Sequence, residues 1–192
     1  AGLTLTRELS KAGLKVITLE GGGLKETKRS QNVYRGDNEG RKYFKLHRAR
    51  RRYLGGSTNC WAGLCTRLRP TDFEKRPWIP HSGWPISIDD VEPFYDEAGT
   101  LLRIGDFHPQ LDQKLPIGQS MKGPGLKLEG FESVYFQMSA PVRFGKLWRD
   151  DLEELDHTKV LLNANVTHLQ LFPHGQALKW VECRAFSGPK FR

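Results

Sequence analysis

Long apolar runs and cysteines are scarce in this sequence. No stretch of about 18 consecutive apolar residues occurs, so we expect no membrane-spanning helix. The three cysteines, Cys60, Cys65 and Cys183, are too few to indicate a disulfide framework. Cys60 and Cys65 lack a second pair at zinc spacing, so we expect reduced thiols and no metal site. A signal-peptide pattern, an internal repeat and a low-complexity linker are also missing.

The composition is that of a globular protein. Of the 192 residues, 38% are hydrophobic and 27% are charged. This length suits one domain, or one domain plus part of another, and is sufficient to bury a core. The net charge of +8 favours anionic partners such as nucleic acid, a membrane surface or cofactor phosphates.

The sequence pattern predicts a helix over residues 4–12 and a short buried strand over residues 15–19. Leu5, Leu9 and Ala12 recur along one face of the helix, and the run KVITL is rich in β-branched residues. The other elements that we expect are helices over 88–102 and 144–155 and a hairpin of strands 160–170 and 177–186 that turns at 173–175.

Gly2 and Glu20 are spaced like two parts of a dinucleotide-binding unit. In such folds a glycine-rich turn and a helix N-terminus hold a pyrophosphate, and an acidic residue after the next strand binds ribose hydroxyls. Gly2 stands where the last glycine of G-x-G-x-x-G would be, and Glu20 follows 18 residues later. The preceding strand and glycines are absent, so we expect the chain to begin inside this unit.

The stretch RRYLGGSTNCWAGLCTRLRP, residues 51–70, combines bare backbone, small polar side chains and a tryptophan. Gly55 and Gly56 let the backbone approach a phosphate or a ring because no Cβ intrudes. Residues 57–59 offer short donors and acceptors, and Trp61 offers a flat apolar surface. These features suit a bound cofactor; the alternative is a tight glycine turn beside a core tryptophan.

Residues 51–95 resemble the glucose–methanol–choline (GMC) family of FAD-dependent oxidoreductases, and look most like its bacterial branch of sugar and gluconate dehydrogenases. The loop R-x-L-G-G-S-T begins the resemblance at Arg52. The later block contributes Asp72 to Glu74, Arg76, Trp78, Pro80, Ser82 to Pro85, Val91, Pro93, Phe94 and Tyr95. The helix and strand before the loop, and residues 161–171, stand where the family would place them.

The resemblance implies an FAD site in which the loop lies along the pyrophosphate and under the isoalloxazine ring. The residues that it implies are Gly2, Glu20, Leu54, Gly55, Gly56, Ser57, Thr58, Asn59, Cys60, Trp61, Ala62, Gly63 and, beside the adenine, Val166. Some relatives carry a histidine at the position of Cys60, and in a few it holds the flavin covalently. We interpret Cys60 as a small buried thiol beside a non-covalently bound FAD.

The expected fold is α/β, with an FAD/NAD(P)-binding Rossmann-like domain that lacks its first strand and first glycines, and with the start of an α+β substrate region. We expect residues 1–102 to form the FAD-binding portion. Residues 103–140 would be an excursion that begins the substrate region, and residues 141–192 would return to the FAD-binding portion.

The predicted function is the oxidation of a CH–OH group of a sugar, polyol or sugar acid by hydride transfer to flavin. The family's catalytic base, a histidine with a second His or Asn, matches nothing here. We therefore assign no catalytic residue, expect the base C-terminal to this chain, and expect these 192 residues alone to be inactive. The electron acceptor (oxygen, a quinone or a cytochrome) and a cytoplasmic or periplasmic location stay open.

Two other functions stay open. The run RKYFKLHRARRRY, residues 41–53, interleaves aromatics with Lys and Arg, as surfaces for single-stranded nucleic acid do. We expect instead that this run faces solvent and binds no nucleic acid. The other alternative is a dinucleotide-fold protein that binds a cofactor without redox turnover.

Overall fold

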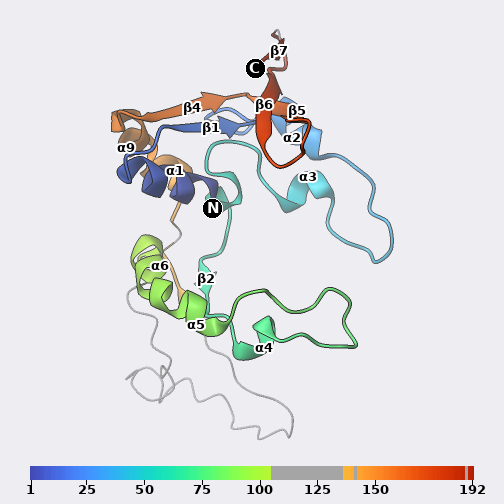
Figure 1. The fold of residues 1–192 in the computed structure, drawn as a ribbon, viewed down its shortest axis with the longest axis vertical. Coiled ribbons are helices and arrows are strands. Elements are labelled where there is room, and N and C mark those ends of the chain that lie inside the picture. The colour runs from blue at the N-terminus through green and yellow to red at the C-terminus, as the bar shows by residue number, and fades with distance from the viewer. Residues whose placement is uncertain (105–135, 141, 189) are drawn as a thin grey trace, which may run out of the picture. The chain divides into compact units, whose positions relative to one another are not determined.

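The structure is a computed structural model that describes residues 1–104, 136–140, 142–188 and 190–192. It mixes helices with strands, and the strands within these ranges form three small sheets (Figure 1). The described helices are α1 Gly2–Lys11, α2 Lys28–Gln31, α3 Leu46–Ala49, α4 Pro70–Phe73, α5 Ile88–Val91, α6 Tyr95–Leu102, α8 Phe144–Leu147 and α9 Arg149–Glu154, with 3-10 turns η1 Asn32–Tyr34, η2 Gly56–Asn59 and η3 Glu92–Phe94. The described strands are β1 Val16–Glu20, β2 Leu64–Cys65, β3 Gln137–Met138, β4 Thr158–Leu162, β5 Asn165–Leu171, β6 Leu178–Arg184 and β7 Lys190–Phe191.

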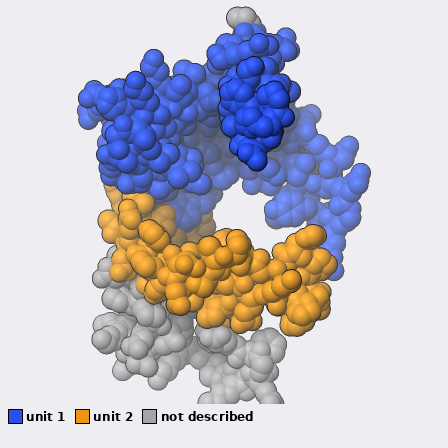
Figure 2. Space-filling view, viewed as in Figure 1, with its two compact units in different colours: residues 1–61, 143–192 blue, residues 62–142 orange. Residues whose placement is uncertain are grey.

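The chain divides into two compact units (Figure 2). Unit 1 contains residues 1–61 and 143–192, and unit 2 contains residues 62–142. The expected FAD-binding portion, residues 1–102, thus spans both units. Most of the expected excursion, residues 103–140, lies outside the described residues.

In unit 1, α1 packs on β1 through small hydroxyl side chains. The hydroxyl oxygens of Thr6 and Thr18 lie 2.6 Å apart, and Thr6 is only 3% exposed. Leu5 and Leu9, which recur along one face of this helix, are 60% and 41% exposed, so the contact with β1 is made by other residues. Short side chains at the contact allow the close approach that the Thr6–Thr18 hydrogen bond requires.

β1 pairs in parallel with β4, in register from Val16 opposite Thr158 to Glu20 opposite Leu162. The expected single strand over 160–170 is wrong, because the chain turns a corner at Asn163, whose φ is 56°. The corner is held by hydrogen bonds from the Asn163 and Ala164 amides to the carbonyls of Gly22 and Glu20, at 2.8 and 2.9 Å. Asn tolerates this left-handed conformation better than most residues.

The C-terminal sheet is an antiparallel β5–β6–β7 arrangement. β5 and β6 form the expected hairpin, which is closed by a hydrogen bond of 2.8 Å from the Gly175 amide to the Phe172 carbonyl. A mixed α/β chain with a parallel β1–β4 pair is therefore present. The Rossmann-like arrangement itself stays a prediction.

Unit 2 contains the second half of the sequence block that carries the family resemblance. The Ser82 hydroxyl donates to the Arg76 carbonyl and accepts from the Arg76 amide, both at 2.8 Å. The Trp84 amide donates to the Phe73 carbonyl at 3.2 Å, and the rings of these two residues meet edge to face. The SGWP motif thus closes a loop onto α4. None of the described helices is long and apolar enough to cross a membrane.

Candidate cofactor-binding site

A pocket of about 390 Å³ in unit 1 brings together four segments that are distant in the sequence. It is formed by the N-terminal end of α1, the C-terminal end of β1, the loop that leads into η2 together with the start of η2, and the first residue of α8. Its lining residues are Ala1, Gly2, Leu3, Thr4, Thr18, Leu19, Glu20, Leu54, Gly55, Gly56, Ser57, Thr58 and Phe144. A volume of a few hundred Å³ is typical of small-molecule sites.

The first turn of α1 gives the pocket an electropositive end. α1 has no side chain that caps its N-terminus, and no acidic residue lies in its first turn. The first backbone N–H groups of a helix have no partner within the helix, and the helix dipole favours an anion there. A Cβ placed on Gly2 would meet no atom of the described residues within 4 Å. This end of the pocket suits a phosphate.

Glu20 stands at the end of β1, at the edge of the same pocket. One carboxylate oxygen accepts a hydrogen bond of 2.6 Å from the Gly22 amide, which fixes the side chain. Within the part of the chain that is described, the other oxygen accepts no hydrogen bond and can receive one from a ligand hydroxyl.

Arg52 holds the loop against the glycines that follow β1. Its guanidinium donates to the Gly21 carbonyl at 2.6 Å, to the Ser30 hydroxyl at 3.1 Å and to the Asn165 side chain, and the residue is 9% exposed. A Cβ on Gly22 would lie 2.1 Å from the Arg52 carbonyl oxygen. The expectation that the basic run faces solvent is therefore wrong at Arg52, since its charge satisfies buried oxygens.

The surroundings of Gly55 and Gly56 explain the absence of a side chain in different ways. Gly55 has a φ of 91°, and a Cβ there would lie 2.6 Å from the Gly145 nitrogen. The bare backbone of Gly55 thus serves contact with α8. Gly56 has a φ of 53°, and the nearest atom to a Cβ there is the Arg51 carbonyl oxygen at 3.8 Å. Only Gly56 leaves open space for a ligand.

The small polar residues of the loop mostly hydrogen-bond to the loop itself. The Thr58 hydroxyl donates to the Gly55 carbonyl at 2.5 Å, and the Ser57 hydroxyl oxygen accepts from the Arg51 amide at 3.2 Å. The Asn59 side chain donates to the Leu54 and Gly56 carbonyls at 2.9 and 3.0 Å. Asn59 does not line the pocket; its side chain stabilises η2 through these two hydrogen bonds.

Six expected FAD residues do not line this pocket: Asn59, Cys60, Trp61, Ala62, Gly63 and Val166. Cys60 is exposed, which corrects its interpretation as a buried thiol, and its Sγ donates to the Ser57 carbonyl at 3.4 Å. Hydrogen bonding to Cys60, together with the nearby Glu26, raises the pKa of the Arg51 guanidinium. Trp61 is half-buried, and Val166 is 48% exposed in β5, opposite Cys183.

Ala62 and Gly63 belong to unit 2. Gly63 has a φ of 88°, and its carbonyl accepts a hydrogen bond of 2.8 Å from the Ser139 amide. A Cβ there would lie 2.4 Å from the Ser139 carbonyl oxygen. This glycine is therefore required where β2 meets the segment after β3.

Sequence reasoning missed the contribution of residues 143–145. Phe144 lines the pocket, and the Arg143 guanidinium donates to the carbonyls of Thr58 and Trp61 at 3.1 and 3.0 Å. The pattern around Phe144 predicts a helix but not its contact with the loop. The sequence Arg-Phe-Gly, in which a glycine is the second residue of a helix, gives only a weak signal.

Among the described residues, no group of three or more His, Cys, Asp or Glu side chains is arranged to hold a metal ion. Comparisons of the chain with known protein families, curated proteins and solved structures found no match.

Proposed function

We propose that the chain is the FAD-binding part of an oxidoreductase that oxidises a CH–OH group of a sugar, polyol or sugar acid. The observation that carries the proposal is one shared pocket for the open first turn of α1, the Glu20 carboxylate and the loop at Gly56. These are the three elements that a dinucleotide needs for its pyrophosphate, its ribose hydroxyls and the close approach of the backbone.

The residues present fit this cofactor in charge and in shape. The α1 N-terminus favours the pyrophosphate, while the carboxylate of Glu20 accepts hydrogen bonds from ribose hydroxyls. Leu54 and Phe144 form an apolar wall of the pocket. A dinucleotide is larger than this pocket, so these residues would hold the pyrophosphate and its neighbouring ribose.

The bound flavin would supply the hydride acceptor, and the residues of this chain would bind and orient it. Arg143 and Asn59 keep the loop in shape through the carbonyls that they bind. Arg52 keeps the loop against the end of β1. The proton acceptor for the substrate hydroxyl is not assigned to any residue described here.

The first experiment is the visible absorbance of the purified full-length protein, followed by addition of sugars, polyols and sugar acids. Stoichiometric flavin that is bleached by one of these compounds supports the proposal. Bound flavin that no compound reduces would favour a cofactor-binding protein without redox turnover. A protein that neither retains nor binds added FAD contradicts the proposal.

The pair Gly56→Val and Gly175→Val tests the site itself. Both glycines have positive φ, and a Cβ on either has no close protein neighbour, so the two variants carry similar backbone strain. We expect only Gly56→Val to lose flavin. Glu20→Ala should weaken FAD binding by about 1.5–3 kcal/mol, the range for a hydrogen bond to a charged group. An unchanged dissociation constant would remove Glu20 from the site.

A further inference from the structure

A cationic loop in unit 1, here defined as residues 35–48, takes no part in the pocket described above. Its cations are Arg35, Arg41, Lys42, Lys45 and Arg48, all of them exposed, and its acids are Asp37 and Glu39. Within the described residues none of these five cations forms an ion pair. Burial and, to a lesser extent, the nearby charges of Arg35, Arg48 and Lys45 lower the pKa of His47.

Two aromatic side chains project from the same loop. Tyr43 is 63% exposed and Phe44 is 76% exposed, and their rings meet edge to face with centroids 5.7 Å apart. The Asn38 side chain donates to the Phe44 carbonyl at 3.2 Å, which draws the two sides of the loop together. These two adjacent aromatics, flanked by Lys42 and Lys45, form a small exposed apolar tip within a cationic surface.

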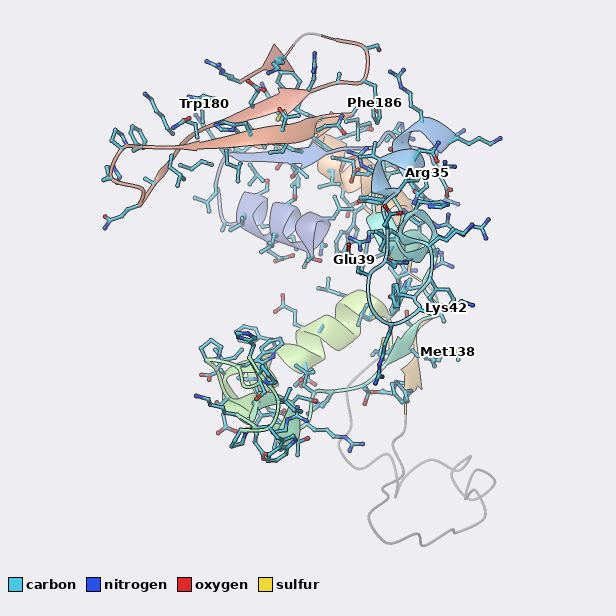
Figure 3. The ribbon with its side chains drawn as sticks, turned by 90° about the vertical axis from the view of Figure 1, so that its right-hand side faces the viewer. Arg35, Glu39, Lys42, Met138, Trp180 and Phe186 are labelled. Carbon is cyan, nitrogen blue, oxygen red and sulfur yellow. The ribbon has the colours of Figure 1, made fainter. Side chains whose placement is uncertain are left out.

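The base of the loop is held firmly. The Gln31 side chain, which is 6% exposed, donates to the carbonyls of His47 and Arg50 at 2.7 and 2.6 Å. Figure 1 shows the connection between η1 and α3 as an open loop that reaches away from the strands, and Figure 3 shows Arg35, Glu39 and Lys42 along it. The loop is thus presented from an ordered base.

The shape of the loop decides between possible anionic partners. Every residue from 35 to 45 is exposed, so the loop projects and offers no walls of a groove. Single-stranded nucleic acid is bound in grooves with aromatic platforms, whereas a bilayer surface is flat and needs only a projecting contact. Aromatic rings favour the headgroup region, and clustered Lys and Arg favour anionic lipid.

We propose that residues 35–48 dock the protein on an anionic phospholipid bilayer. Tyr43 and Phe44 enter the headgroup region, and the five cations lie against the lipid phosphates. The contact is peripheral and reversible, because it combines a short apolar tip with electrostatic attraction. This inference does not depend on the proposed flavin chemistry.

The test is co-sedimentation of the full-length protein with vesicles of phosphatidylcholine, with and without phosphatidylglycerol. We expect binding only to the anionic vesicles and a loss of binding as salt is added. Tyr43→Ser/Phe44→Ser and Lys42→Gln/Lys45→Gln should each weaken binding by about tenfold or more, since each juxtamembrane cation contributes severalfold. Brominated lipids should quench an added tryptophan in Phe44→Trp.

Matched controls separate the loop from general charge and hydrophobicity. Trp78→Ser removes an aromatic that is 76% exposed in unit 2, and Lys15→Gln/Lys159→Gln removes two exposed cations elsewhere in unit 1. Both controls should bind as the parent does. Equal binding to neutral vesicles, or loop variants that bind like the controls, would overturn the proposal. So would tighter, loop-dependent binding of a single-stranded oligonucleotide, which would identify a nucleic-acid surface.

Discussion

Gly55 and Gly145 meet backbone to backbone. A Cβ on Gly55 would lie 2.6 Å from the Gly145 nitrogen, and a Cβ on Gly145 would lie 2.1 Å from the Leu54 carbonyl oxygen. No side chain fits at either position without movement of the main chain. The contact brings α8, and with it Phe144, against the loop that lines the pocket. The pocket thus depends on a glycine that lies 90 residues from the loop.

Gly145→Ala should therefore separate α8 from the loop. An added methyl group in a well-packed site costs about 1–3 kcal/mol of stability. Here the methyl group would meet the main chain at Leu54, which moves less readily than a side chain. We expect a lower thermal unfolding midpoint together with weaker FAD binding, measured by calorimetry on the same preparation. A variant with the stability and FAD affinity of the parent would show that α8 does not shape the pocket.

Gly2→Ala should change binding without loss of stability. A Cβ on Gly2 meets nothing within 4 Å in the described part of the chain, and alanine is the better helix former. The methyl group would nevertheless lie at the end of α1 that we assign to the pyrophosphate. We expect a higher dissociation constant for FAD and an unfolding midpoint at least equal to that of the parent. Unchanged affinity would move the pyrophosphate away from Gly2.

Arg52→Met should destabilise unit 1 strongly. The change leaves the Gly21 carbonyl and the Asn165 side chain without their charged donor. Each lost hydrogen bond to a charged group costs about 1.5–3 kcal/mol, so we expect a loss of more than about 3 kcal/mol in the free energy of unfolding in urea. Arg48→Met, at an exposed position of the same run, is the control and should stay close to the parent. Similar losses in both variants would refute the buried role of Arg52.

Glu182 should make the stability of the β5–β6–β7 sheet depend on pH. A hydrogen bond from Lys190, and a further one from Thr167, lower the pKa of the Glu182 carboxyl. Unfolding returns this pKa to its ordinary, higher value, so the unfolded state binds the proton more readily. The stabilisation is therefore fully present above the ordinary pKa of a glutamate, and it is lost as the pH falls through the lowered pKa.

The measurement for Glu182 is the unfolding midpoint across this acidic range, in the parent and in Glu182→Gln. The variant should lose part of the dependence on pH, whereas Glu153→Gln, at an exposed site on α9, should keep it. If the parent and Glu182→Gln have parallel profiles, the Lys190 contact contributes nothing to stability.

The sequence by itself determined the elements that depend on neighbouring residues. A helix near 4–12, a strand near 15–19 and a hairpin that turns at 173–175 follow from local periodicity and turn chemistry, and the structure has α1, β1 and the β5–β6 hairpin there. Motif spacing singled out Gly2 and Glu20, and the glycine loop singled out Gly56; the structure brings all three to one pocket. Whether FAD fills it stays a prediction.

Only the tertiary structure decided what depends on contacts between distant segments. The corner at Asn163 arises because its amide and that of Ala164 donate to the carbonyls of Gly22 and Glu20, at the end of β1 and just beyond it. No local sequence pattern predicts that pairing. From the sequence, Arg52 is one more cation of a run that is expected to face solvent. In the structure its guanidinium donates hydrogen bonds to oxygens of Gly21, Ser30 and Asn165. Local patterns report the conformation of a segment; the partners that satisfy its polar groups come from elsewhere in the chain and are fixed only when the chain packs.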